Sequence, residues 1–162
     1  MRESMAQLTP RFSASRAVCD YTERHYLPAA NAFHSRHANQ GALGRQMVDW
    51  HNNLAQKWPG LHFGEVTVDT QGDHHNFAAQ IFLPDLDPAA VRLELYANGP
   101  NDGAPFRQEM KQLRPIDGAA GGWIYAASVP ANRPAADFTA RVIPRFDGIA
   151  IPLEDARILW QR

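Results

Sequence analysis

Apolar side chains recur at helical spacing in the first part of the chain. The hydroxyl of Ser13 can cap a helix that runs to His25, in which Val18 and Tyr21 share one face. Pro28 then either kinks this helix or serves as the first residue of a second one. The pattern predicts helices, and no sheet, over this part of the sequence.

A further stretch, residues 40–57, is amphipathic. Its apolar positions are spaced by four, three and four residues, which predicts a helix with one apolar face. These positions are Leu43, Met47, Trp50 and Leu54. Trp-Pro-Gly at 58–60 ends the helix, because proline cannot continue it and glycine favours a terminus.

After Gly60 the apolar period shortens to two, which is typical of strands. Val91, Leu93 and Leu95 alternate with Arg92 and Glu94, so we expect the apolar three to face a core and the charged two to point outward. Similar patterns mark 77–83, 123–129 and 138–142, and 61–70 and 158–162 supply the first and last strands. Glycine- and proline-rich turns separate these segments.

Six or seven short strands with regular turns predict an antiparallel β-sandwich of immunoglobulin-like size. The fold class is therefore α+β, with a helical segment at 1–60 and a sandwich domain at 61–162.

Composition narrows the classes of protein. The chain has 162 residues, of which 44% are apolar and 20% charged, a globular balance that excludes a disordered chain. Sixteen basic against seventeen acidic residues favour neither a nucleic-acid nor a membrane partner. The single cysteine, Cys19, excludes an internal disulfide, and no apolar run nears the ~20 residues of a membrane span. With a polar start that lacks a signal-peptide core, we expect a cytoplasmic protein.

The residues alone identify no self-sufficient active site. His34 and His37 stand three apart on a helix, and His74 and His75 are expected in a turn, but no third ligand completes either pair, so we interpret them as solvated surface histidines. Gly-rich residues 118–122 lack the Lys-Ser/Thr of a phosphate loop and predict a hairpin connection. No catalytic, cofactor-binding or metal-binding residue is assigned.

Aromatic side chains leave one binding hypothesis open. Tryptophans at strand and helix positions are more often core residues than ligand platforms. An exposed Trp123 or Tyr96 could nevertheless stack on a sugar ring, with Arg107 or Asn98 bonding its hydroxyls. These four residues are the candidate carbohydrate contacts.

Both ends of the chain resemble one enzyme family. Ser-Met-x-x-Leu-x-Pro-x-Phe at 4–12, Arg16-Ala-Val, Asp20-Tyr and Tyr-Leu-Pro-Ala at 26–29 are similar to the last helical part of bacterial α-glucan phosphorylases. Ser13, Ala17 and Asp20 stand where that family commonly has Asn, Met and Glu. The segment from 138 to 160, with its Arg-Val-Ile-Pro and Ile-Leu-Trp runs, is similar to the closing β segment of the same subgroup.

The resemblance implies the C-terminal piece of a much larger glycosyltransferase. That family phosphorolyses α-1,4-glucans to glucose 1-phosphate with pyridoxal phosphate, held by a lysine in a Gly-Thr-Gly-Asn-Met-Lys context. No position of this chain matches that motif, so no cofactor is expected in the chain and the chain alone is expected to be inactive.

Three roles follow as alternatives. The first is a non-catalytic accessory piece whose partner is the rest of the phosphorylase catalytic domain. The second is a carbohydrate-binding module that holds α-glucan near the parent's active site. The third is a structural or oligomer-contact domain, in which the apolar faces of the N-terminal helices mediate a homo-oligomer.

Overall fold

The structure is a computed structural model that describes residues 8–9, 12–99 and 103–161. The chain forms two compact units, residues 1–49 and 50–162.

The first unit is helical. Helix α2 (Ala14–Tyr21) begins as expected, with the Ser13 hydroxyl accepting a hydrogen bond from the Arg16 backbone N–H at 3.2 Å. A π-helical segment, η1 (Thr22–Tyr26), leads into helix α3 (Leu27–Lys57), with Pro28 in its first turn. Because proline lacks an N–H and its ring crowds the carbonyl four residues earlier, the widened turn relieves a clash at this point.

Helix α3 is interrupted at Ala38–Gly41, as the separate amphipathic stretch from residue 40 predicted. Asn39, Gln40 and Gly41 all have positive φ angles there, of 53°, 57° and 77°. The last part of α3 enters the second unit, where Leu54 is fully buried. A short 3-10 turn, η2 (Trp58–Gly60), ends the helical region at the predicted Trp-Pro-Gly.

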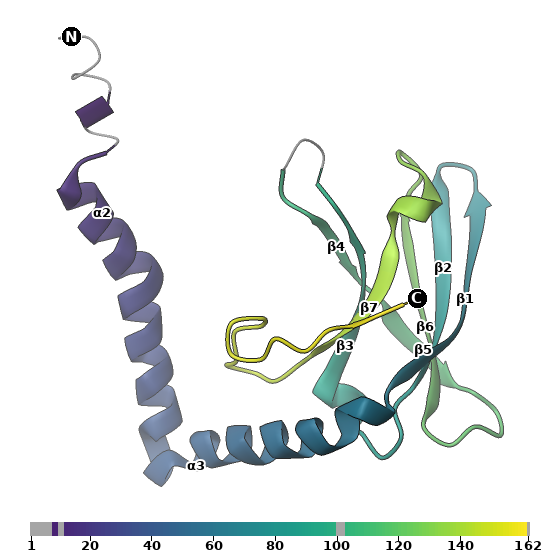
Figure 1. Cartoon of the computed structure of the whole chain (residues 1–162), viewed down its shortest axis with the longest axis horizontal. Helices are drawn as coiled ribbons and strands as arrows, with labels where there is room; N and C mark the ends of the chain where they lie inside the picture. The colour runs from purple at the N-terminus through teal and green to yellow at the C-terminus, as the bar shows by residue number, and fades with distance from the viewer. Residues whose placement is uncertain (1–7, 10–11, 100–102, 162) are drawn as a thin grey trace. The chain divides into compact units, whose positions relative to one another are not determined.

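The second unit contains two antiparallel sheets of four strands each, so the fold is α+β (Figure 1). One sheet has the order β1-β2-β6-β5 and the other β4-β3-β7-β8. The strands are β1 (His62–Gln71), β2 (His74–Phe82), β3 (Val91–Ala97), β4 (Phe106–Glu109), β5 (Lys111–Pro115), β6 (Gly122–Pro130), β7 (Thr139–Pro144) and β8 (Leu159–Trp160). Two 3-10 turns, η3 (Pro88–Ala90) and η5 (Ala135–Asp137), lead into β3 and β7.

The two sheets share one hydrophobic core. Inward residues of β3, including Leu93 and Leu95, lie in the same buried cluster as Ala79 and Ile81 of β2 and Val129 of β6. The inward positions Val91, Leu93 and Leu95 are thus confirmed. Strands β4 and β5 were not predicted, because they are short and mostly exposed and carry no regular apolar alternation.

The fold corrects one sequence interpretation and adds to another. His74 and His75 begin strand β2 and do not lie in a turn, which occupies only Gly72 and Asp73. Glu94 does lie on the opposite face of β3 from Leu93, but it is only 3% exposed.

Candidate functional site

A row of polar and aromatic residues crosses the outer face of the second sheet. The strand register places Glu109 of β4, Glu94 of β3, Arg141 of β7 and Trp160 of β8 side by side. Because side chains alternate along strands, this row faces away from Leu93 and Leu95. Residues from all four strands therefore meet on one surface.

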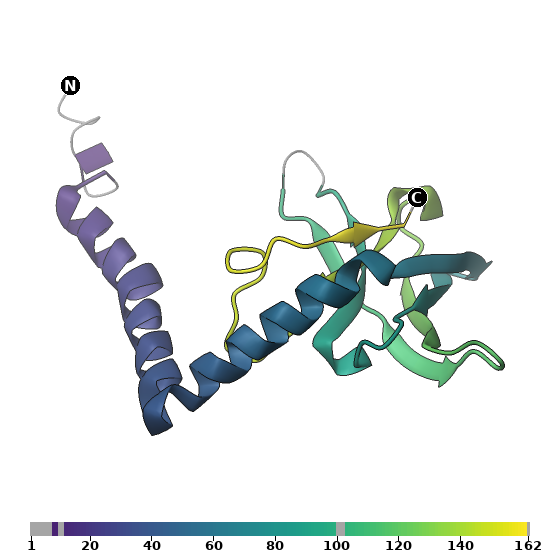
Figure 2. The same ribbon diagram turned by 60° about the horizontal axis from the view of Figure 1, so that its bottom comes forward.

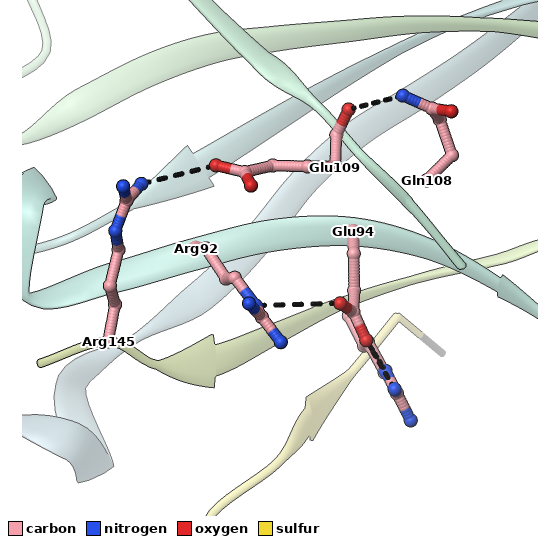
Figure 3. Close-up of polar contacts among 6 residues, drawn as sticks. Arg92, Glu94, Gln108, Glu109 and Arg145 are labelled. Carbon is pink, nitrogen blue, oxygen red and sulfur yellow. Dashed lines mark hydrogen bonds and ion pairs between the residues drawn. The ribbon is translucent and has the colours of Figure 1, made fainter. Parts of the chain in front are cut away.

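Glu94 and Arg141 form a buried ion pair at the centre of this row. Arg141 Nε donates to Glu94 Oε1 at 2.7 Å, and Arg141 Nη2 donates to the same oxygen. Arg92 Nε lies 3.6 Å from the other oxygen of Glu94. Figure 3 draws this contact between the two side chains. An unpaired carboxylate is costly to bury, so this pairing explains why Glu94 is buried where the alternation alone predicted exposure.

Two aromatic rings cover the Arg141 guanidinium. Its Cζ lies 4.3 Å from the ring centre of Tyr96 and 5.0 Å from that of Trp160. The two rings contact each other edge to face, with centres 5.4 Å apart. Cation–π contacts of this kind shield the ion pair from water. These contacts tie strands β3, β7 and β8 together.

A second, exposed ion pair lies beside the first. Arg145 Nη1 is 3.2 Å from Glu109 Oε1, and both side chains are about half exposed, at 55% and 53%. The Gln108 side chain donates to the Glu109 backbone carbonyl at 3.2 Å (Figure 3). The same surface thus carries one buried and one solvent-exposed Arg–Glu pair.

The structure brings together three of the four candidate carbohydrate contacts. Tyr96 and Arg107 are direct cross-strand neighbours, and the Tyr96 hydroxyl donates to Asn98 Oδ1 at 3.3 Å. Trp123 lies on β6 of the other sheet and packs, partly buried, against the hydrophobic core. Trp123 therefore does not share a surface with the other three.

His75 is buried, which corrects its interpretation as a solvated histidine. Its Nδ1 lies 2.8 Å from the Thr70 hydroxyl and its Nε2 lies 3.0 Å from the Arg133 carbonyl oxygen. Since the carbonyl can only accept, Nε2 donates to it. The neighbouring His74 is half exposed, and its Nδ1 lies 2.6 Å from Asp73 Oδ1. The hydrogen bond between these two side chains lowers the pKa of the Asp73 carboxyl below its usual value.

A pocket of about 570 Å³ opens where the β3–β4 and β6–β7 connections meet. Its apolar wall includes Pro105, Phe106, Pro130 and Phe138. Asn132, Arg133 and Asp137 supply its polar groups. The volume lies within the range of about 300–1,000 Å³ that is typical of ligand pockets.

The segment after β7 is attached to the end of helix α3. Trp50 contacts Phe146 with ring centres 5.3 Å apart, and His51 Nδ1 lies 3.4 Å from Asp155 Oδ2. Figure 2 shows this yellow segment beside the helix. Asp155 is 5% exposed and also accepts a hydrogen bond from the Arg157 backbone N–H at 3.0 Å.

Among the residues that the structure describes, no three side chains of His, Cys, Asp or Glu converge to form a metal site. None of the described helices is long and apolar enough to span a membrane.

Known proteins that are similar to this chain include glycogen and maltodextrin phosphorylases. No protein-family model matches the chain. Glycogen phosphorylase of Mycobacterium bovis (strain ATCC BAA-935 / AF2122/97) is 27% identical over 160 residues, which covers 93% of this chain and 18% of that relative. The same identity and coverage hold for glycogen phosphorylase of Mycobacterium tuberculosis (strain ATCC 25618 / H37Rv).

A third relative is similar over nearly the whole chain. Maltodextrin phosphorylase of Thermococcus litoralis is 26% identical over 169 aligned positions, covering 99% of this chain and 20% of that protein. The chain thus spans about a fifth of the length of the curated relatives that it matches. These similarities relate the chain, over most of its length, to part of the glycogen and maltodextrin phosphorylases, the family that its terminal motifs resemble.

Proposed function

We propose that this chain is a non-catalytic, C-terminal part of an α-glucan phosphorylase and acts there as a structural and interaction piece. The parent enzyme would phosphorolyse α-1,4-glucans to glucose 1-phosphate. The observation that carries the proposal is the solvent exposure of the side chains in the helical unit. Among its described residues up to Asp49, every one is exposed or only partly buried.

The exposed residues of this unit include large apolar side chains. Val18 is 63% exposed, Tyr21 58% and Phe33 62%. Burial of such a side chain contributes about 1.5–3 kcal/mol, so a set of them left in water favours a partner surface. The partner we propose is the remaining four fifths of a phosphorylase chain.

The two lysines of the chain do not fit the pyridoxal phosphate of the parent enzyme. The Lys57 ammonium group donates to the Asp85 backbone carbonyl, and Lys111 is exposed on strand β5. A Schiff-base lysine needs a site that lowers its pKa and holds the cofactor phosphate. The cofactor would therefore be held by the rest of the parent enzyme.

The fold we infer for the second unit is an immunoglobulin-like sandwich. Its strand orders, 1-2-6-5 and 4-3-7-8, correspond to A-B-E-D and C′-C-F-G of that fold. In this architecture the loops cluster at the two ends of the sandwich, which agrees with an interaction role.

The test is binding and activity in trans. A phosphorylase of Mycobacterium tuberculosis that lacks its matching fifth would be mixed with this chain, and glucose 1-phosphate release from glycogen and phosphate would be measured. We expect the chain alone to release none, and to bind the shortened enzyme. Phosphorolysis by the repurified chain alone would contradict the proposal.

A matched pair of variants locates the surface. Phe33→Ser removes an exposed apolar side chain, whereas Asn31→Ser changes an exposed polar one on the same helix. Phe33→Ser should weaken binding to the shortened enzyme about 10-fold or more, and Asn31→Ser should leave it unchanged. Equal effects would show that the helical unit is not the contact surface.

A second candidate function is carbohydrate binding by the sheet unit. It is favoured by the convergence of Tyr96, Arg107 and Asn98 at one end of strand β3. The Tyr96 ring already covers Arg141, so its face is only partly available to a sugar. The pocket next to Asn98 therefore becomes the stronger location for a ligand.

A further inference from the structure

We propose that the pocket between the β3–β4 and β6–β7 connections binds a glucose unit of a linear α-1,4-glucan. This inference rests on the second candidate function above and moves its site away from Tyr96 and Trp123. It is independent of whether the helical unit docks on a phosphorylase.

The pocket has a hydrophobic wall for the apolar face of a sugar ring. Phe106 begins strand β4 and is partly buried, and its ring lies edge to face with that of Phe138 at 5.5 Å. Phe138 is 8% exposed and is held further by ring contacts with Phe77 and His75. The wall is thus fixed before a ligand arrives, which lowers the entropic cost of binding.

Two polar side chains of the pocket, Arg133 and Asp137, are also held in place. Arg133 Nε donates to Asp137 Oδ2 at 3.1 Å, and Arg133 Nη1 donates to the Asn98 carbonyl at 2.9 Å. The Arg133 guanidinium also lies over the Phe138 ring at 5.5 Å. The Arg133 backbone carbonyl accepts a hydrogen bond from buried His75, so both the backbone and the side chain of Arg133 are anchored.

The charge balance indicates a neutral ligand. Arg133 and Asp137 neutralise each other, so the pocket offers no net attraction to a phosphate or to an ammonium group. A carboxylate can still accept further hydrogen bonds when one oxygen is engaged, and the exposed amide of Asn132 both donates and accepts. Vicinal hydroxyl groups on a ring with an apolar face match this combination.

The test is an NMR titration of the full chain with maltoheptaose, with inorganic phosphate as a second probe. We expect saturable shifts of the amide signals of Ala104, Phe106, Asn132, Arg133 and Phe138 with maltoheptaose, and none with phosphate. Shifts caused by phosphate at the same amides would overturn the assignment of a neutral ligand.

Two variants with the same chemistry make the test specific. Asn132→Ala removes a pocket amide, and Asn53→Ala removes an exposed amide on helix α3. Loss of one or two hydrogen bonds should weaken maltoheptaose binding about 3- to 10-fold for Asn132→Ala and leave Asn53→Ala unchanged. Both substitutions are at exposed positions, so the fold should survive them.

The outcomes separate this inference from the functions proposed above. Binding that is lost in Arg107→Ala but unchanged in Asn132→Ala would overturn the pocket and keep the carbohydrate-binding function at Tyr96 and Arg107. Absence of any maltoheptaose binding would overturn both carbohydrate proposals. The docking assay with the shortened phosphorylase is unaffected by either result.

Discussion

At the scale of single residues, the pairing of Glu94 with Arg141 decides how the outer face of the second sheet is built. Alternation along β3 assigns Glu94 to the face away from the core, and that assignment is correct. Burial depends instead on Arg141 from a strand 47 residues later, and on the two rings that cover it. A charge in this position is stable only with its partner.

We therefore expect Glu94→Gln to destabilise the protein by about 3–5 kcal/mol, because it leaves Arg141 buried without a counter-charge. The matched control is Glu109→Gln, which breaks the half-exposed pair with Arg145 and should cost about 0–1 kcal/mol. Urea unfolding of the two variants and the unchanged protein measures both values. Equal costs would mean that water reaches the Glu94 pair.

Tyr125 gives a prediction for alkaline pH. It is 5% exposed in the core, and burial raises its pKa to about 12 from an ordinary value near 10. The unfolded chain releases this proton first, so the stabilising contribution is complete below about pH 10 and is lost as the pH rises towards 12. Unfolding midpoints in urea from pH 9 to 12 should fall less steeply for Tyr125→Phe. An identical slope in this variant would contradict the assignment.

At the scale of elements, the connection from β5 to β6 shows what glycine contributes. The sequence predicted a hairpin connection at 118–122, and the two strands do pair antiparallel. Gly118 and Gly121 both have positive φ, of 74° and 71°. Only Gly121 also lies against another strand end: its carbonyl accepts from the Leu83 N–H at 2.8 Å, and a Cβ atom there would lie 2.9 Å from the Leu83 carbonyl oxygen.

Gly118→Ala should accordingly cost about 1 kcal/mol, because only the backbone conformation is unfavourable for alanine. Gly121→Ala should cost about 2–4 kcal/mol, since the methyl group also pushes Leu83 away. Thermal and urea unfolding of the two variants compare these costs directly. A Gly121→Ala variant as stable as Gly118→Ala would show that the connection shifts freely.

At the scale of the whole molecule, the two units differ in how their apolar side chains are covered. The sheet unit buries its own core, whereas the helical unit leaves Val18, Tyr21, Tyr26 and Phe33 more than half exposed. Short helices gain most of their stability from packing on other elements. Without a partner, the helical unit should therefore self-associate or open readily.

Hydrogen exchange and light scattering test this expectation together. Amides of Ser13 to Tyr26 should exchange much faster than those of the central strands β2, β3 and β6, or the protein should form oligomers as its concentration rises. Phe33→Ser should reduce any such association. A monomer at all concentrations with strong protection throughout Ser13 to Tyr26 would contradict the prediction.

The sequence by itself determined the elements whose signal is local. The Ser13 cap, the end of the helix at 58–60 and the inward positions of β3 follow from hydrogen-bonding capacity, proline geometry and a period of two, all of which act over a few residues. Its terminal motifs also indicated the relationship to the phosphorylases that the comparisons support.

Only the tertiary structure decided what depends on residues far apart in the chain. The burial of Glu94 and His75, the pairing of the short strands β4 and β5, and the pocket formed by two connections each require a partner that no local pattern identifies. The physical reason is that burial of a polar group or an edge strand is favourable only when its hydrogen bonds are satisfied, and the satisfying atoms come from other strands.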